Sequence, residues 1–162
     1  MMRHTILQVG RLRRRFFREA VDEYQRRLEG YARVRLLDVP EEKSADPGNA
    51  AEKERVLEVE GRSLSTAAES AGRGYWIALD ERGKMTTSEG LAAFLQKRTI
   101  GGESHFIWFI GGPMGLSEDL KGRCALRLAL SRMTFPHEMV PMILAEQIYR
   151  AHRIMRGEPY HL

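Results

Sequence analysis

Residues 106–115 read Phe-Ile-Trp-Phe-Ile-Gly-Gly-Pro-Met-Gly, five apolar side chains followed at once by a turn with three glycines. A short apolar run without polar alternation is typical of a strand buried on both faces, in the middle of a parallel sheet. Ligands of such sheets bind beyond the carboxyl ends of the strands, where glycines let the backbone approach a ligand closely. The stretch therefore predicts a central strand at 106–110 and a candidate ligand-binding turn at 111–115. The alternative is a tight strand-to-helix connection that binds nothing.

The sequence on either side of this stretch alternates between strand and helix patterns. Strands are predicted at 4–9, 34–39, 75–79 and 126–130, and helices at 16–28, 50–71, 86–98, 117–124 and 137–155. We expect an interruption of the second helix near Gly61, a turn at 81–85, and a capping box formed by Thr86 and Glu89. The alternation predicts an α/β fold with a mostly parallel sheet flanked by helices. No internal repeat or linker divides the chain, so we expect a single domain over residues 1–162.

Composition restricts the class of protein. The chain has 162 residues, 43% of them hydrophobic, and one cysteine, so it can form neither an internal disulfide nor a cysteine-rich zinc site. Its longest strongly apolar run has far fewer than the roughly 20 residues that cross a bilayer. The first residues lack an apolar stretch of signal-peptide length. We therefore expect a cytoplasmic protein without a membrane or metal partner.

Positive charge is concentrated near the start of the chain. The formal net charge is +4, and residues 11–35 contain arginines at positions 11, 13, 14, 15, 18, 26, 27, 33 and 35. Guanidinium groups bind phosphate in a bidentate manner, which makes this segment a candidate nucleic-acid surface. A solvated helix face with Glu–Arg pairs explains the same pattern equally well.

The common nucleotide and hydrolase signatures are missing. Gly10 follows the first predicted strand but is not followed by the glycine-rich dinucleotide fingerprint, and no phosphate-binding loop of the G-x-x-x-x-G-K-[ST] type is present. No G-x-S-x-G elbow is found, and Cys124 lies in a helical stretch where a buried small side chain is expected. Dinucleotide dehydrogenases, phosphate-loop NTPases and serine hydrolases are therefore poor explanations.

Four ordered motifs in the last third of the chain resemble one known family. They are Ile110-Gly111-Gly112-Pro113-Met114-Gly115-Leu116-Ser117, Leu130-Ser131-Arg132-Met133-Thr134-Phe135-Pro136-His137, Glu146-Gln147-Ile148-Tyr149-Arg150-Ala151 and Pro159-Tyr160-His161. In type and spacing they are similar to the SPOUT-class methyltransferases that methylate ring nitrogen 3 of a pseudouridine in large-subunit ribosomal RNA. Upstream the resemblance is weaker, with a Leu-Asp pair at Leu79-Asp80 and a comparable strand–helix start.

The resemblance implies a fold and a cofactor that composition does not reveal. Members of the family have an α/β fold whose C-terminal segment forms a trefoil knot, and they bind S-adenosylmethionine in that knot. Carried over by position, the cofactor-binding residues are Leu79, Gly111, Leu130, Ser131, Arg132, Met133, Thr134 and Phe135. Backbone groups of these loops are expected to bind the adenine edge, while Leu79, Leu130 and Phe135 supply apolar walls.

The resemblance also implies a homodimer in which the tail of one subunit completes the active site of the other. Tyr160 and His161 are then the candidate catalytic residues, with His161 as general base or substrate orienter. Arg150 and Arg153 are candidate RNA-binding residues, although Arg150 and Glu146 stand four apart on one helix and can simply pair with each other. The apolar stripe of the last helix suits a dimer interface and an intrachain core equally well.

Two positions depart from the family pattern, and two other functions stay open. Leu162 stands where many relatives have a basic residue, and Pro141 is expected to kink the last helix unless it lies in the first turn. The expected substrate is large-subunit ribosomal RNA in the assembled ribosome. The alternatives are a SPOUT methyltransferase that acts on transfer RNA and a ribosome-associated RNA-binding protein without activity.

Overall fold

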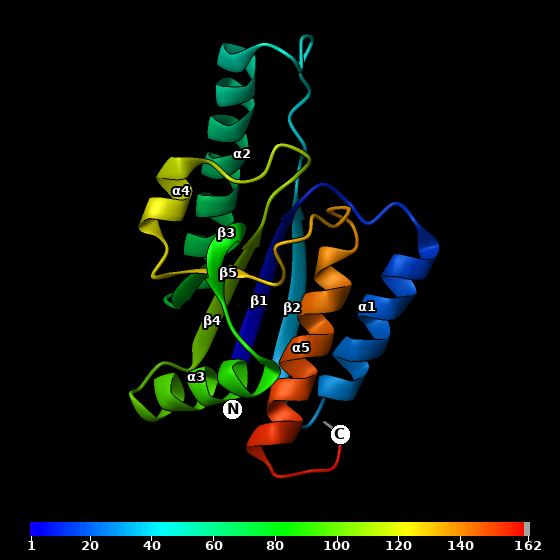
Figure 1. Cartoon of the computed structure of the whole chain (residues 1–162), viewed down its shortest axis with the longest axis vertical. Helices are drawn as coiled ribbons and strands as arrows, with labels where there is room; N and C mark the ends of the chain where they lie inside the picture. The colour runs from blue at the N-terminus through cyan, green and yellow to red at the C-terminus, as the bar shows by residue number, and fades with distance from the viewer. Residues whose placement is uncertain (161–162) are drawn as a thin grey trace.

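The computed structural model describes residues 1–160, which form a five-stranded sheet between two layers of helices (Figure 1). The strands are β1 (Met2–Val9), β2 (Ala32–Val39), β3 (Tyr75–Met85), β4 (His105–Ile110) and β5 (Leu126–Ala129). The helices are α1 (Arg15–Leu28), α2 (Ala50–Ala71), α3 (Ser88–Ile100), α4 (Glu118–Arg123) and α5 (Val140–Met155). The strand order is β2-β1-β4-β3-β5, and every pairing is parallel. The predicted α/β class is therefore confirmed.

The apolar run at 106–110 forms the central strand, as predicted. All six residues of β4 are buried, and the strand pairs with β1 on one side and β3 on the other. Alternate side chains of a strand point to opposite faces, so Trp108 lies in one half of the core and Phe109 in the other. Both faces of the sheet are covered, which explains why this strand has no polar alternation.

The two helical layers cover opposite faces of the sheet. On one face, α1, α3 and α5 bury Leu28, Leu95 and Leu144 against the strands. On the other face, α2 and α4 bury Leu64 and Leu120. Because every strand runs in the same direction, all carboxyl ends lie at one edge of the sheet, where α1 and α5 begin (Figure 1).

Two details of the helix predictions were wrong. Helix α2 is continuous through Gly61. The glycine allows close packing against Ser117, the N-cap of α4, because an added Cβ would approach the Ser117 hydroxyl to 2.9 Å. The N-cap of α3 is Thr87, whose side chain accepts a hydrogen bond from the Gly90 amide at 2.9 Å. Thr86, the predicted cap, is one residue too early, and single-residue boundaries are set by backbone geometry that sequence spacing does not resolve.

The predicted turn at 81–85 is instead part of β3. Leu128 of β5 is the register partner of both Leu79 and Lys84, so residues 80–83 form an insertion that leaves the ladder before pairing resumes. At Gly83 an added Cβ would lie 2.7 Å from the Arg127 carbonyl, so only glycine lets the two backbones approach this closely. Such bulges redirect side chains at sheet edges. Here the bulge carries Asp80 and Glu81 to the carboxyl edge.

Helix α5 begins at Val140, three residues after the predicted start, and Pro141 lies in its first turn. An amide in the first turn has no intrahelical acceptor, so proline is accommodated there without a kink. Within residues 1–160, no helix is both long and apolar enough to cross a membrane.

Three buried rings link β1, β4 and α5. Trp108 Nε1 donates a hydrogen bond to His4 Nδ1 at 3.2 Å, and His4 Nε2 lies 3.1 Å from His152 Nε2. Since Nδ1 of His4 accepts from tryptophan, the His4 proton is on Nε2 and is donated to His152. Burial lowers the pKa of both imidazoles, that of His152 to about 4, so this group is neutral at physiological pH.

Candidate functional site

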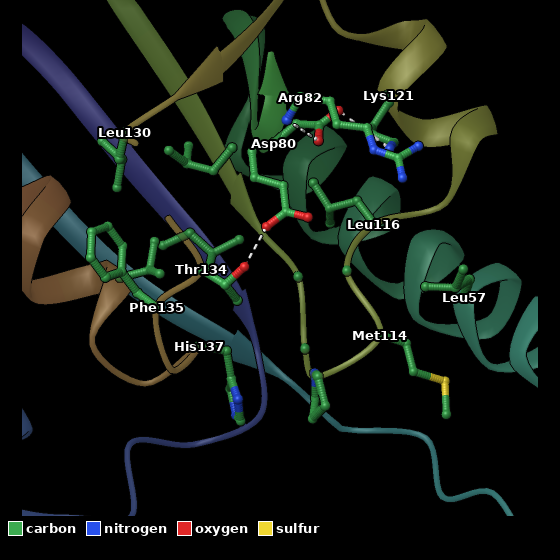
Figure 2. Close-up of a pocket in the computed structure, with 18 of the residues that line it drawn as sticks. Leu57, Asp80, Arg82, Met114, Leu116, Lys121, Leu130, Thr134, Phe135 and His137 are labelled. Carbon is green, nitrogen blue, oxygen red and sulfur yellow. Dashed lines mark hydrogen bonds and ion pairs between the residues drawn. The ribbon is translucent and has the colours of Figure 1, made fainter. Parts of the chain in front are cut away.

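A cleft of about 820 Å³ opens at the carboxyl edge of the sheet, where three loops meet. These loops are the bulge after Leu79, the β4–α4 connection at 111–115 and the β5–α5 connection at 130–137. Figure 2 shows Leu130 and Phe135 on one side of the cleft and Met114 and Leu116 on the other. A cleft of this size suits a nucleotide-sized organic ligand.

Seven of the eight predicted cofactor residues line this cleft. They are Leu79, Gly111, Leu130, Ser131, Met133, Thr134 and Phe135. Arg132 does not belong to the lining, and its guanidinium donates a hydrogen bond to the Glu81 carbonyl oxygen. Met133 lines the cleft but is 75% exposed, so little of its side chain is buried by the protein itself.

The glycines of the β4–α4 loop are required by the turn itself. A Cβ at Gly111 would lie 2.4 Å from the Gly115 carbonyl carbon, a distance that no side chain tolerates. The Gly115 amide closes the turn by donating to the Gly112 carbonyl at 3.0 Å, and Gly115 has a φ of +84°. At its three glycines the loop therefore presents main-chain groups without Cβ atoms to the cleft, beside the side chains of Pro113 and Met114.

Side-chain hydrogen bonds hold the β5–α5 loop in place. The Ser131 hydroxyl accepts from the Met133 amide at 3.0 Å, and the Thr134 hydroxyl donates to a Glu81 carboxylate oxygen at 2.9 Å. The second bond, drawn as a dashed line from Thr134 in Figure 2, joins the loop to the β3 bulge. Two of the three loops are thus connected directly across the cleft.

An ion pair lies in the floor of the cleft. Lys121 Nζ is 3.3 Å from the Asp80 carboxylate, and only 12% and 10% of these two side chains are exposed. Burial on its own raises the pKa of Asp80, but the Arg82 amide and the Lys121 ammonium outweigh it, so the net pKa lies below its usual range. Asp80 is therefore a carboxylate at neutral pH.

Sequence reasoning did not identify Glu81 and Lys121 as site residues. Each lies in a segment that carries no recognisable motif, and Lys121 is on the short helix α4, far along the chain from Asp80. Only the shared edge of the sheet brings these residues together. The position of Asp80 after a strand was the single available signal.

The chemistry of the cleft suits an adenosine-type ligand, and cationic and anionic side chains are balanced in its lining. Leu79, Leu130 and Phe135 can contact a flat ring, the main chain of the loops offers donors and acceptors, and the Glu81 carboxylate adds negative charge. No three metal-binding side chains among residues 1–160 lie close enough together to hold an ion.

Tyr160, the last described residue, does not line the cleft of its own chain. Tyr160 packs on Tyr149 with a ring-centroid distance of 4.9 Å, and its hydroxyl donates to Glu146 at 3.2 Å. These contacts are on the middle and C-terminal part of α5, whereas the cleft is lined by Val140 at its beginning. The helix has 16 residues, about 24 Å in length. His161 lies outside the described residues.

The two arginines predicted to bind RNA already have partners within the chain. Arg150 pairs with Glu146 at 2.7 Å, as the i,i+4 spacing allowed, and its guanidinium lies 4.6 Å from the centre of the Tyr160 ring. Arg153 pairs with Glu158 at 3.0 Å. Less than a quarter of each arginine side chain is exposed. Contacts of these guanidinium groups with RNA stay a prediction.

Fold and cleft together define a class of protein, a parallel α/β protein that takes an organic ligand in loops at the carboxyl edge of its sheet. Residues 2–161 match a family model described as "Predicted SPOUT methyltransferase". The chain therefore belongs to the SPOUT methyltransferase family. It is 42% identical over 160 residues to a protein of Symbiobacterium thermophilum named "Ribosomal RNA large subunit methyltransferase H", covering 99% of both chains.

Solved structures agree on the fold. A probable methylase family protein from Haemophilus influenzae matches with a TM-score of 0.54 at 8% identity, over 99% of this chain and 70% of that one. A putative methylase family protein from Neisseria gonorrhoeae matches with a TM-score of 0.52 at 15% identity, over 99% of this chain and 85% of that one. At these identities the likeness concerns the arrangement of strands and helices.

Proposed function

We propose that this protein transfers a methyl group from S-adenosylmethionine to ring nitrogen 3 of a pseudouridine in large-subunit ribosomal RNA. The observation that carries the proposal is the meeting of three loops at one cleft, in a chain that is 42% identical over its length to a ribosomal RNA methyltransferase. The four motifs at 110–117, 130–137, 146–151 and 159–161 support the choice of pseudouridine as target.

S-adenosylmethionine supplies a methyl group on a positively charged sulfur, which is already activated for transfer. Leu79, Leu130 and Phe135 hold the adenine between apolar walls, and main-chain groups of Gly111 and of residues 131–134 bind its polar edge. The Glu81 carboxylate favours the positive charge of the donor. The contribution of these loops to the rate is to hold the methyl group in line with the attacking nitrogen, a form of positioning worth about 7–11 kcal/mol in well-oriented systems.

We propose a homodimer in which the tail of each subunit reaches the cleft of the other. Tyr160 of the same chain lies on the later part of α5 and its own cleft lies at the start of that helix, so a second subunit is needed to bring a tail to the cleft. His161 then accepts the proton of the ring nitrogen or orients the base, and Tyr160 stacks or hydrogen-bonds beside it. Arg150 and Arg153 contact RNA phosphates.

The remaining parts of the proposal follow from the family. The C-terminal segment is threaded as a trefoil knot around the donor, the enzyme works in the cytoplasm, and it acts on the assembled ribosome. The proposed homodimer explains how a chain of 162 residues covers enough RNA to select a single nucleotide.

The test is a methyl-transfer assay with radiolabelled donor on three substrates, namely assembled ribosomes, free ribosomal RNA and transfer RNA. Incorporation into assembled ribosomes, at a position that nuclease mapping identifies as pseudouridine, is the expected result. Incorporation into transfer RNA alone would show that the substrate is transfer RNA and not ribosomal RNA. Calorimetric titration with S-adenosylmethionine, with NADH as control, completes the test, because RNA binding without donor binding would identify an RNA-binding protein without activity.

A further inference from the structure

The strongest feature outside the cleft is the arginine-rich connection between β1 and α1. Arg11, Arg13, Arg14 and Arg15 are all exposed, and the neighbouring Phe16 has 58% of its surface exposed. The first turn of α1 contains no acidic residue. Cations near the amino end of a helix are repelled by the helix dipole, and each lowers the stability of the helix by a few tenths of a kcal/mol. The arginines at this position therefore do not stabilise the fold.

Most of this charge is not neutralised by the protein. Arg15 pairs with Glu19 at 2.7 Å, and Arg11 reaches Asp38 only at 3.9 Å with 88% of its side chain exposed. Within residues 1–160, the guanidinium groups of Arg13 and Arg14 have no ion-pair or hydrogen-bond partner. Three positive charges are therefore available to an external anion.

The main chain of this segment is held firmly although its side chains are exposed. The Arg18 guanidinium donates to the carbonyl oxygens of Leu12 and Arg13 at 2.8 and 2.9 Å. Leu12 is 8% exposed and packs in a small apolar cluster with Phe17 and Met139. The arginines thus project from an ordered loop, which reduces the entropy lost when they bind a ligand.

A direct contact joins the segment to the loop that borders the cleft. The Arg13 amide donates to a Glu138 carboxylate oxygen at 2.6 Å. His137, the residue before Glu138, lines the cleft. Figure 1 shows α1 and α5 beginning at the same end of the molecule, beside the end of β1. The positive segment therefore lies next to the β5–α5 loop that borders the cleft.

We infer that Arg11, Arg13 and Arg14 bind the phosphate backbone of RNA next to the nucleotide presented to the cleft. The inference rests on the proposed function for its choice of RNA as the anion. Ordered arginines on one exposed loop, with an exposed phenylalanine among them, provide the forks that bind phosphates and a ring on which an unpaired base stacks. Phosphate contacts of this kind position the RNA without reading its sequence.

The test compares two variants that each lose three positive charges. The first is Arg11→Gln/Arg13→Gln/Arg14→Gln. The control is Arg33→Gln/Arg73→Gln/Lys97→Gln, whose exposed residues lie at the opposite edge of the sheet. Binding of a fluorescent 20-nucleotide oligouridylate is measured by anisotropy over a series of salt concentrations. Each phosphate contact contributes roughly 0.7 to the slope of log K against log salt for a single strand. We expect the first variant to reduce the slope by about 2 and the control to keep the wild-type slope.

Three further measurements decide between explanations. The first variant should bind S-adenosylmethionine as the wild type does, because none of its three positions lines the cleft. Its KM for assembled ribosomes should rise while kcat stays close to that of the wild type. An unchanged salt slope in the first variant overturns the inference. The inference is also overturned if the first variant becomes monomeric while the control does not, because the arginines would then lie between subunits. Absence of methyl transfer by the wild type would instead refute the proposed function, and the RNA titration would still report on the arginines.

Discussion

Thr134 and Glu81 form a hydrogen bond of 2.9 Å that connects the loop after β5 to the bulge of β3, across a separation of 53 residues in the sequence. Both residues line the candidate cleft, and both are exposed at its surface. The bond therefore determines the distance between two walls of the cleft and contributes little to the buried core. We expect this bond to preorganise the proposed donor site.

Replacement of Thr134 by Val should weaken donor binding with little effect on stability. The loss of one hydrogen bond to a carboxylate is worth about 1 kcal/mol, or roughly a fivefold increase in Kd for S-adenosylmethionine. Calorimetric titration measures this change. Thr99→Val is a matched control, because the buried Thr99 hydroxyl has no hydrogen-bond partner among the described residues. Equal donor affinity of the two variants would show that the Thr134 bond is dispensable.

Gly111→Ala should abolish the shape of the β4–α4 loop. The new Cβ would meet the Gly115 carbonyl at 2.4 Å, so the turn must open and the wall of the cleft must move. We expect at least a tenfold loss of donor affinity, about 1.4 kcal/mol. Gly122→Ala is the control, since nothing lies within 4 Å of a Cβ there and alanine favours the helix. Unaltered binding by Gly111→Ala would exclude this loop from the donor site.

Lys121→Met should destabilise the protein and change its dependence on pH. It leaves the mostly buried Asp80 carboxylate without its cation, at an expected cost of about 1–3 kcal/mol. In the wild type the pKa of Asp80 is lower when folded than the value of about 3.9 in an unfolded chain. Its contribution to stability is thus present above pH 4 and is lost as pH falls through the folded pKa.

In Lys121→Met this contribution should disappear or change sign, because the folded pKa of Asp80 rises. Urea unfolding at pH 7 and at about pH 2, below the unfolded pKa, measures the difference. The double variant Lys121→Met/Asp80→Asn should recover part of the lost stability, because no uncompensated charge is left. A single variant as stable as the wild type at pH 7 would contradict the prediction.

The buried imidazoles predict a second loss of stability at mildly acidic pH. Burial, with a smaller contribution from Arg156, lowers the pKa of folded His152 to about 4, whereas an unfolded histidine titrates near 6.5. Between these values the unfolded chain binds a proton that the folded chain does not, so stability falls as pH is lowered from about 6.5. One group contributes a slope of at most about 1.4 kcal/mol per pH unit. His152→Gln should reduce the slope by up to this amount, as measured by urea unfolding from pH 7 to pH 5. Identical slopes would mean that the pKa of His152 is not lower in the folded than in the unfolded chain.

Mixing two inactive variants tests whether the site is shared between subunits. Gly111→Ala damages the cleft and His161→Ala damages the tail. If the tail of each subunit serves the cleft of its partner, a mixed dimer has one cleft and one tail intact at the same site. Unfolding and refolding an equal mixture should then restore about a quarter of the wild-type methyl transfer, since half of the dimers are mixed and each has one working site of two. No recovery, with mixed dimers present, would mean that each tail serves its own subunit.

The sequence by itself determined the α/β class, the central position of 106–110 and the approximate bounds of every element except β3, which continues to Met85 through the segment predicted as a turn. These properties follow from local patterns, because an apolar run or a helical period records which faces of a segment are buried. The motifs at 110–117 and 130–137 and the Leu79-Asp80 pair also identified the three loops around the cleft. The sequence left two possibilities for Pro141, a kink in the last helix or a place in its first turn. The structure places it in the first turn of α5, where no kink results.

Only the tertiary structure decided which side chains meet at the carboxyl edge. The bulge after Leu79, the Lys121–Asp80 pair and the bond between Thr134 and Glu81 each join segments that are distant in the chain. The same is true of Arg132, which turned out to bind the Glu81 carbonyl and not to line the cleft, and of Arg13, whose amide binds Glu138. Parallel strands bring their carboxyl ends to one edge whatever the loops contain. The contacts made there depend on register and on loop geometry, and no local pattern in the sequence encodes them.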